Sequence, residues 1–139
     1  MAYGQRMEVD NVDNLCKVEI TVEANASKYW ALMAYKDAKG TRHEKKIEAE
    51  RSASTNSNHI QALIEALGAL NRPCMLDVFT SCDYLIAPFQ QGWITSWEKN
   101  GWTNAKGNAV RNAEQWKELR RKLTDHSARF MHKDKNTEV

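Results

Sequence analysis

Residues 93–102 read Trp93-Ile94-Thr95-Ser96-Trp97-Glu98-Lys99-Asn100-Gly101-Trp102. Two of the three tryptophans lie four residues apart, about one helical turn, so they share one face of a helix. Gly101 then ends the pattern, because glycine adopts the left-handed backbone that commonly closes a helix. This stretch predicts a short helix over residues 93–100, followed by a loop that Trp102 anchors by folding back.

Positive charge gathers in and after this stretch. Residues 93–122 hold seven Lys and Arg against three Asp and Glu, whereas residues 1–92 hold ten against twelve. A run of charge is most often a solvated helix face, but interleaved tryptophans favour a surface for nucleic acid. Helical spacing also predicts core packing for Trp116, and it favours core packing for Trp93. The residues predicted to contact nucleic acid here are Trp93, Trp97, Lys99, Trp102, Lys106 and Arg111.

Length and composition bound the class of protein. The chain has 139 residues, enough for one domain with a hydrophobic core, and a net charge of +2. It contains no run of 18 apolar residues, so we expect no membrane span. Three widely spaced cysteines fit reduced thiols, and the polar first residues lack a secretory signal, so we expect a cytoplasmic protein. We expect residues 1–14 to be a flexible extension and residues 15–139 to form the domain.

The remaining pattern predicts an α/β fold. Alternating apolar residues predict a strand over residues 15–22, and two more strands over 29–35 and 42–50 flank a turn. The third strand is dense in Lys and Glu, which suits the edge of a sheet. A helix follows, capped at residues 54–56 and ended by Pro73. Later elements are a strand over residues 75–79, two or more helices that include 93–100 and about 110–123, and a strand over 128–132.

Several segments, taken in order, resemble type 1 ribonuclease H. They are Val18-Glu19-Ile20, Ala66-Leu67-Gly68-Ala69-Leu70, Phe79-Thr80-Ser81-Cys82-Asp83-Tyr84, the tryptophan stretch, and Val110-Arg111-Asn112-Ala113-Glu114-Gln115-Trp116. The tryptophan stretch resembles that family's handle, a basic protrusion that grips an RNA/DNA hybrid. The resemblance implies a ribonuclease H-like fold with a five-stranded mixed sheet in the order 3-2-1-4-5 and helices on both faces. It also implies that the C-terminal helix of cellular members is truncated or absent.

The same resemblance implies an active site in which four acidic residues hold two divalent ions. Mg²⁺ prefers oxygen ligands, and two such ions activate a water and stabilise the leaving oxygen. The matching positions are Glu23, His59 and Ser81, with Asp83 two residues later; only Asp134 and Glu138 follow the last strand. Because imidazole and hydroxyl groups are poor Mg²⁺ ligands, we expect a degenerate member without a cofactor. Mg²⁺ or Mn²⁺ would be needed only if activity remains.

Three functions stay open at this stage. The first is non-catalytic binding of an RNA/DNA hybrid or another duplex through the handle, with no membrane partner. The second is a divergent hybrid-cleaving nuclease that uses Glu23, Asp83 and Asp134 with His59. The third is a protein–protein adaptor. Retention of a basic handle favours the first, and the lost carboxylates count against the second.

Other side chains near the predicted site have two interpretations each. Asn25, Thr55 and Asn56 match positions near the substrate strand, although helix capping is the favoured role for Thr55 and Asn56. Glu23 and His59 could form a transition-metal pair, but a structural histidine is favoured. Cys82 has the chemistry of a nucleophile, yet no paired base is identifiable from sequence, so an inert thiol is favoured.

Overall fold

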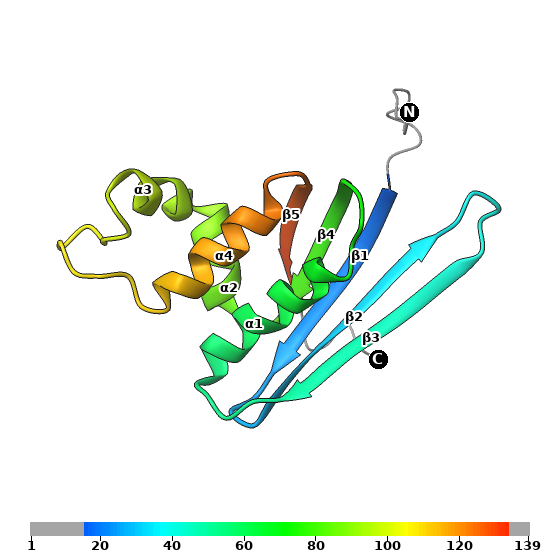
Figure 1. Ribbon diagram of the computed structural model, residues 1–139, viewed down its shortest axis with the longest axis horizontal. Coiled ribbons are helices and arrows are strands. Elements are labelled where there is room, and N and C mark those ends of the chain that lie inside the picture. Colours follow the sequence, from blue (N-terminus) through cyan, green and yellow to red (C-terminus); the bar gives the residue numbers. More distant parts are fainter. Residues whose placement is uncertain (1–15, 134–139) are drawn as a thin grey trace.

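The computed structural model describes residues 16–133, in which five strands and four helices are present (Figure 1). Their bounds are β1 Cys16–Ala24, β2 Lys28–Lys36, β3 Arg42–Glu50, α1 Thr55–Gly68, β4 Cys74–Thr80, α2 Asp83–Gln90, α3 Trp93–Lys99, α4 Ala113–Leu123 and β5 Ser127–His132. The predicted flexible extension and the predicted loss of a C-terminal helix concern residues outside this range.

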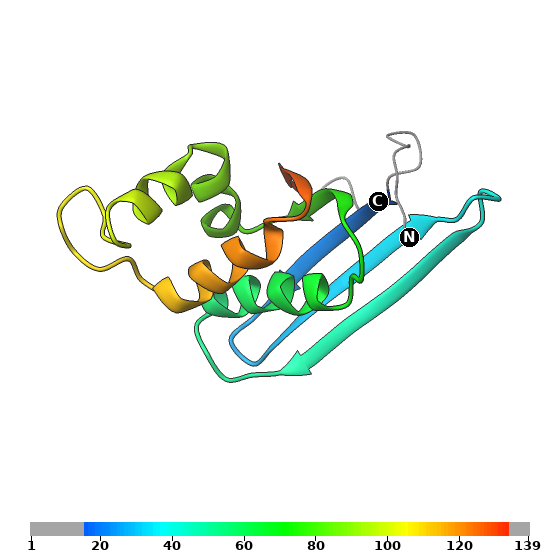
Figure 2. The same cartoon turned by 45° about the horizontal axis from the view of Figure 1, so that its top comes forward.

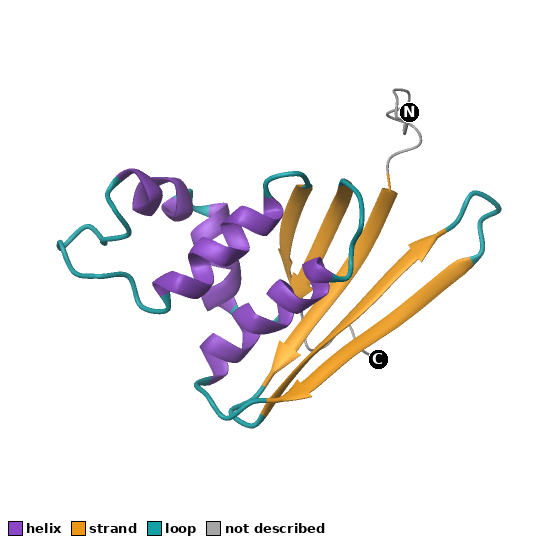
Figure 3. Cartoon of the chain, in the orientation of Figure 1, coloured by secondary structure: helices purple, strands orange, loops and turns teal. Residues whose placement is uncertain are grey.

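The strands form one sheet in the order β3-β2-β1-β4-β5, as predicted (Figure 3). β1 is central because alternate residues are apolar: Val18, Ile20 and Val22 are at most 4% exposed. It pairs antiparallel with β2 and parallel with β4, and β5 is parallel to β4. β3 lies at the edge, and all its residues except Ile47 and Ala49 are exposed, which confirms the prediction drawn from its charge.

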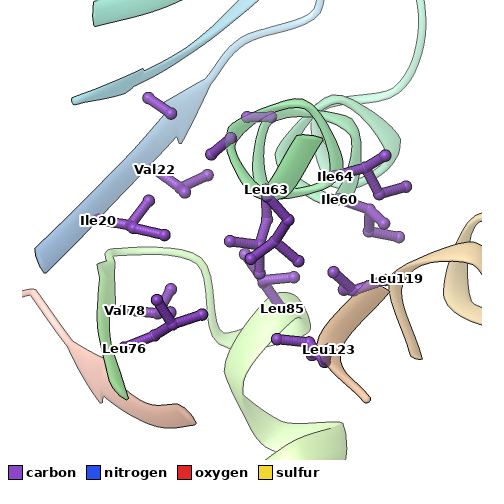
Figure 4. Close-up of a cluster of buried hydrophobic side chains, with 14 of the residues drawn as sticks. Ile20, Val22, Ile60, Leu63, Ile64, Leu76, Val78, Leu85, Leu119 and Leu123 are labelled. Atoms are coloured by element: carbon purple, nitrogen blue, oxygen red, sulfur yellow. The ribbon is translucent and has the colours of Figure 1, made fainter. Parts of the chain in front are cut away.

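The described helices lie on one face of this sheet, with α3 beyond its end (Figure 2). α1 packs against β1 and β2, α2 packs against β4 and β5, and α4 packs against α1. Leu63 of α1 points toward Leu85 of α2 within the buried cluster, alongside Ile20 of β1 (Figure 4). The prediction of helices on both faces therefore holds for one face only within residues 16–133.

The boundary of α1 corrects one prediction. The helix begins as expected, since the Ser54 side chain accepts a hydrogen bond from the Ser57 amide at 3.0 Å. It ends at Gly68, not at Pro73. The amides of Ala69 and Leu70 each bond to a carbonyl three residues back, so the chain tightens and leaves the helix before the proline is reached.

Two smaller predictions have different outcomes. The β2–β3 turn is confirmed, because Asp37 Oδ1 accepts hydrogen bonds from the amides of Lys39 and Thr41, and Gly40 has a φ of 84°. The predicted helix over residues 110–123 starts later, at Ala113. Val110 is nevertheless 7% exposed, so it joins the core from the preceding loop.

Candidate functional site

The carboxyl edge of the sheet brings together residues that are far apart in sequence. β1, β4 and β5 are parallel, so their carboxyl ends meet at one edge, where α/β proteins commonly bind ligands. Glu23 lies at the end of β1, Ser81 follows β4, and Lys133 follows β5. His59 reaches the same place from α1, since its side chain lies 3.6 Å from that of Glu23.

Glu23 is contacted by hydrogen-bond donors and cations. The Ser81 hydroxyl donates to Glu23 Oε1 at 2.8 Å, and His59 Nε2 lies 3.6 Å from the same oxygen. Lys133 Nζ lies 3.9 Å from Glu23 Oε2. The carboxylate side chain is only 19% exposed, so water screens these contacts poorly. The carboxylate therefore faces one hydroxyl donor, one imidazole and one ammonium group of the chain itself.

His59 is held in a way that favours its charged form. Its Nδ1 lies 2.8 Å from the Thr55 carbonyl oxygen, which can only accept, so Nδ1 carries a proton. Burial lowers the pKa of His59, but Cys82, the Thr55 carbonyl and Glu23 together raise it above its usual value of 6.5. The imidazole ring is only 4% exposed, and its Nε2 faces the Glu23 carboxylate.

This arrangement predicts a pH-dependent contribution to stability. A pKa that is raised in the folded state gives stability that is fully present below the unfolded pKa and is lost as pH rises through the folded pKa. The free energy of unfolding of wild type should therefore exceed that of a His59→Gln variant by an amount that shrinks as pH rises above the ordinary histidine pKa of 6.5. Denaturant titrations across this range measure it, and a pH-independent difference would contradict the assignment.

A second feature is the handle segment, defined as residues 93–112, which extends away from the sheet (Figure 1). Trp97 attaches it to the body: its ring lies 5.9 Å from that of the buried Trp116 and 6.5 Å from that of Trp102. The Trp102 amide also bonds to the Trp97 carbonyl at 2.6 Å, so the predicted fold-back is confirmed. The core prediction is right for Trp116, which is fully buried.

The core prediction for Trp93 is wrong. This residue is 47% exposed, and its ring contacts Trp97 at a centroid distance of 6.3 Å. In the first turn of α3 it is the neighbouring Ile94, 4% exposed, that enters the core, so Trp93 is directed away from it. Lys99, Lys106 and Arg111 are exposed along the same segment. The handle segment thus presents one tryptophan and three cations to solvent.

Cations of α4 border the handle segment. Lys117, Arg120 and Arg121 line a hollow of about 320 Å³ together with Trp102, Glu98 and Thr124. Arg120 lies 3.6 Å from Glu98 and Lys117 lies 3.0 Å from Glu114, so both are partly compensated. These cations belong to the positive stretch of the sequence but are absent from the predicted site residues.

Comparison with known proteins places this architecture. The family model for RNase H matches residues 20–133, which span most of the sheet, all four described helices and the handle segment. The chain belongs to the ribonuclease H family. Ribonuclease H of a Thermus thermophilus strain is 37% identical over 89 residues, which are 63% of this chain and 54% of that protein. Ribonuclease H of Caldanaerobacter subterraneus is 40% identical over 70 residues, which are 50% and 46%. This chain thus spans about half the length of these ribonuclease H relatives.

Solved structures share the fold at low sequence identity. LC9-RNase H1, a type 1 RNase H with the type 2 active-site motif, superposes with a TM-score of 0.75 at 14% identity, over 93% of this chain and 66% of that one. The foamy viral protease-reverse transcriptase in complex with RNA/DNA hybrid superposes with a TM-score of 0.62 at 15% identity, over 99% and 20%. No helix among residues 16–133 is long and apolar enough to cross a membrane.

The ribonuclease H family implies a site for two divalent ions, and the described residues do not fit it. Glu23 is the one carboxylate among the matched positions, and it already accepts from Ser81 and faces the Lys133 ammonium and the His59 imidazole. Asp83 does not supply a second ligand, because its side chain is 85% exposed and lies 3.4 Å from His132. Within residues 16–133, no group of three or more His, Cys, Asp or Glu is placed to hold a metal ion. Asp134 and Glu138 lie outside the described residues.

The remaining predicted site residues have local roles. Asn25 Oδ1 accepts from the amides of Ser27 and Lys28, which closes the β1–β2 turn. Asn56 Oδ1 accepts from the Cys82 thiol at 3.7 Å, and the Thr55 carbonyl accepts from His59. Contact of Asn25, Thr55 and Asn56 with a substrate strand stays a prediction.

Sequence reasoning missed Lys133 and a buried polar network. Asn58 is fully buried and donates to the carbonyls of Asn25 and Arg51, both at 2.8 Å, while Arg51 donates back to Asn58 Oδ1. This network ties α1 to the turn that follows Glu23. The sequence position of Lys133 was the one available signal. Lys133 follows the last parallel strand, and the carboxyl ends of parallel strands meet at the edge where Glu23 lies.

Proposed function

We propose that this chain binds an RNA/DNA hybrid or another duplex through its handle segment and does not cleave it. The observation that carries the proposal is the compensation of Glu23 by Lys133, His59 and Ser81. Two-metal cleavage needs an anionic pocket that holds two dications close to a phosphate. Here cationic side chains stand where such ions would be attracted.

Electrostatic repulsion disfavours a divalent ion beside Glu23. Two unit charges 4 Å apart interact by about 4 kcal/mol at an effective dielectric constant of 20, so a divalent ion entering beside Lys133 and His59 meets strong repulsion. Glu23 alone cannot offset this, since its charge is already shared between those two side chains. The proposed binding therefore needs no metal cofactor.

The binding half of the proposal rests on the handle segment. Lys99, Lys106 and Arg111 are exposed and lie on a segment that extends from the body, so phosphates can reach them without displacing core residues (Figure 1). Structural relatives include the foamy viral protein in complex with RNA/DNA hybrid and in complex with dsDNA, which supports a duplex ligand for this fold. The free thiols of this chain support a reducing compartment such as the cytoplasm.

Replacing Lys99, Lys106 and Arg111 together with alanine should weaken duplex binding. Each phosphate contact releases condensed counterions when the protein binds. Losing a contact should therefore flatten the slope of log K against log salt by up to about 0.9 on duplex DNA. Fluorescence anisotropy with labelled single-stranded, duplex and hybrid oligonucleotides over a salt series measures both effects.

The matched control removes three exposed lysines of the β2–β3 hairpin, Lys36, Lys39 and Lys45. It changes the net charge equally but should leave the salt slope nearly unchanged. If both triple variants bind alike, net charge and not the handle segment determines affinity. If wild type binds no nucleic acid, the protein–protein adaptor becomes the better hypothesis.

A second candidate function follows from the relatives. Two proteins named Ribonuclease H share 37% and 40% identity with this chain over the aligned part, which favours a divergent metal-dependent nuclease. Such an enzyme would have to recruit Asp83 or a residue after 133 to the side of Glu23. Cleavage assays with Mg²⁺ and Mn²⁺ distinguish it from the binding module.

A further inference from the structure

A pair of cysteines lies at the amino ends of the central strands, at the opposite edge of the sheet from Glu23. Cys16 is the first residue of β1 and Cys74 is the first residue of β4, and the two are register partners in the parallel ladder. Register partners in neighbouring strands point to the same face. Adjacent strands run about 4.8 Å apart, and disulfides form across Cα separations of about 4.4–6.8 Å. The backbone therefore already brings these thiols within bonding reach.

The two thiols differ in environment. Cys74 is 3% exposed, and its sulfur lies 3.2 Å from the Arg72 carbonyl oxygen, whereas Cys16 is half-buried. Hydrogen bonding from Cys74 lowers the pKa of Cys16 to about 6 against the opposing effect of burial, and the Arg72 guanidinium lowers it further. The same coupling and burial raise the pKa of Cys74. A half-buried thiol with a lowered pKa thus lies beside a buried thiol with a raised pKa, an arrangement typical of an attacking and a resolving cysteine.

We propose that Cys16 and Cys74 form a reversible redox site that reacts with small-molecule disulfides of the glutathione class. The Cys16 thiolate attacks one sulfur of the disulfide, so a mixed disulfide forms and one small thiolate leaves. Cys74 then loses its proton and attacks the Cys16 sulfur, which releases the second small thiol. The protein gives up two electrons and two protons, and the small disulfide is reduced to two thiols. This site is separate from the proposed binding surface.

Strand geometry predicts that the bond is easily reduced. Parallel neighbours hold their Cβ atoms near the strand spacing of about 4.8 Å, whereas relaxed disulfides prefer a Cβ separation of about 3.8 Å. A bond formed here pulls β1 and β4 together, and strained disulfides have more oxidising potentials than relaxed structural ones. We therefore expect oxidation to be reversed by reduced glutathione.

Peptide mapping of the full chain after incubation with oxidised glutathione tests the proposal. Wild type and the control Cys82→Ser should both yield a Cys16–Cys74 linked peptide that disappears on adding reduced glutathione. Cys74→Ser should instead accumulate glutathione on Cys16, and Cys16→Ser should form no link. A link through Cys82, or a wild-type protein that keeps all three thiols free, would overturn the proposal.

A second measurement needs no variant, so misfolding cannot confound it. Iodoacetamide alkylation of wild type, resolved by peptide and followed against pH, should give Cys16 a reaction midpoint near pH 6. Cys82 serves as the internal reference within the same molecule. If Cys16 is alkylated no faster than Cys82 at pH 7, Cys16 is not the attacking thiol and the proposal is wrong.

Discussion

A labelled RNA/DNA hybrid incubated with this chain and Mg²⁺ is expected to remain uncut. Hard dications need several oxygen ligands, and two-metal cleavage needs two such ions. Among the described residues at the matched positions, Glu23 alone offers a carboxylate, and Lys133, His59 and Ser81 already compensate it. The expected effect is loss of the whole metal-dependent acceleration, which makes it the largest of the predicted effects.

Mn²⁺ gives residual activity the better chance, because it tolerates nitrogen ligands more readily than Mg²⁺. Each metal should therefore be tested with purified wild type and with a Glu23→Gln variant that removes the carboxylate charge. Cleavage by wild type that is lost in the variant would restore the nuclease hypothesis. Equal cleavage by both proteins would identify a contaminating nuclease.

The second large effect is a gain of metal binding. A His59→Glu, Ser81→Asp double variant adds two carboxylates around Glu23, where His59 Nε2 and Ser81 Oγ lie 3.6 and 2.8 Å from its oxygen. Each added charge near a dication should tighten binding at least about tenfold, so Mn²⁺ affinity should rise about 100-fold or more. Mn²⁺ should also raise the melting temperature of the variant, because a ligand that binds only the folded state stabilises it.

The matched control is the neutral pair His59→Gln, Ser81→Asn, which changes shape similarly without adding charge. It should show no Mn²⁺-dependent shift in melting temperature. The metal-free acidic variant should be less stable than this control, since three carboxylates then repel one another. If the melting temperature of the acidic variant is the same with and without Mn²⁺, added negative charge alone does not create a metal site at this edge of the sheet.

Local patterns predicted most of the fold. The alternation of Val18, Ile20 and Val22 identified a strand with one buried face, and the charge of residues 42–50 placed their strand at the edge. These signals work because each depends on residues close in sequence. The short helix of the handle segment was predicted for the same reason, from the spacing of Trp93 and Trp97 and the stop at Gly101, whereas the resemblance to type 1 ribonuclease H identified the segment as a handle.

Two predictions were wrong, the burial of Trp93 and the end of α1. Helical spacing shows that Trp93 and Trp97 share a side of α3, but not that only Trp97 reaches Trp116. Pro73 predicts the end of α1, whereas three-residue hydrogen bonds close the helix earlier. Tertiary packing therefore decides the exposure of Trp93, whereas local backbone hydrogen bonds decide where α1 ends.

The candidate site was predicted in part. The match to the family placed Glu23, His59 and Ser81 together, and the structure brings these three side chains into contact. It gave no indication of Lys133, because a cation after the last strand matters only once parallel strands align their ends. Asn58 was missed for a similar reason, since its partners Asn25 and Arg51 belong to separate turns.

We expect this ribonuclease H-like chain to hold a duplex without using metal ions. The direct measurement is the dissociation constant for a labelled RNA/DNA hybrid, taken by fluorescence anisotropy in EDTA and in Mg²⁺ at matched ionic strength, with the hybrid recovered afterwards. We expect equal dissociation constants in both buffers and an intact hybrid. Binding that weakens about tenfold or more in EDTA, a difference of about 1.4 kcal/mol, or a hybrid that is recovered cut only in Mg²⁺, would contradict it.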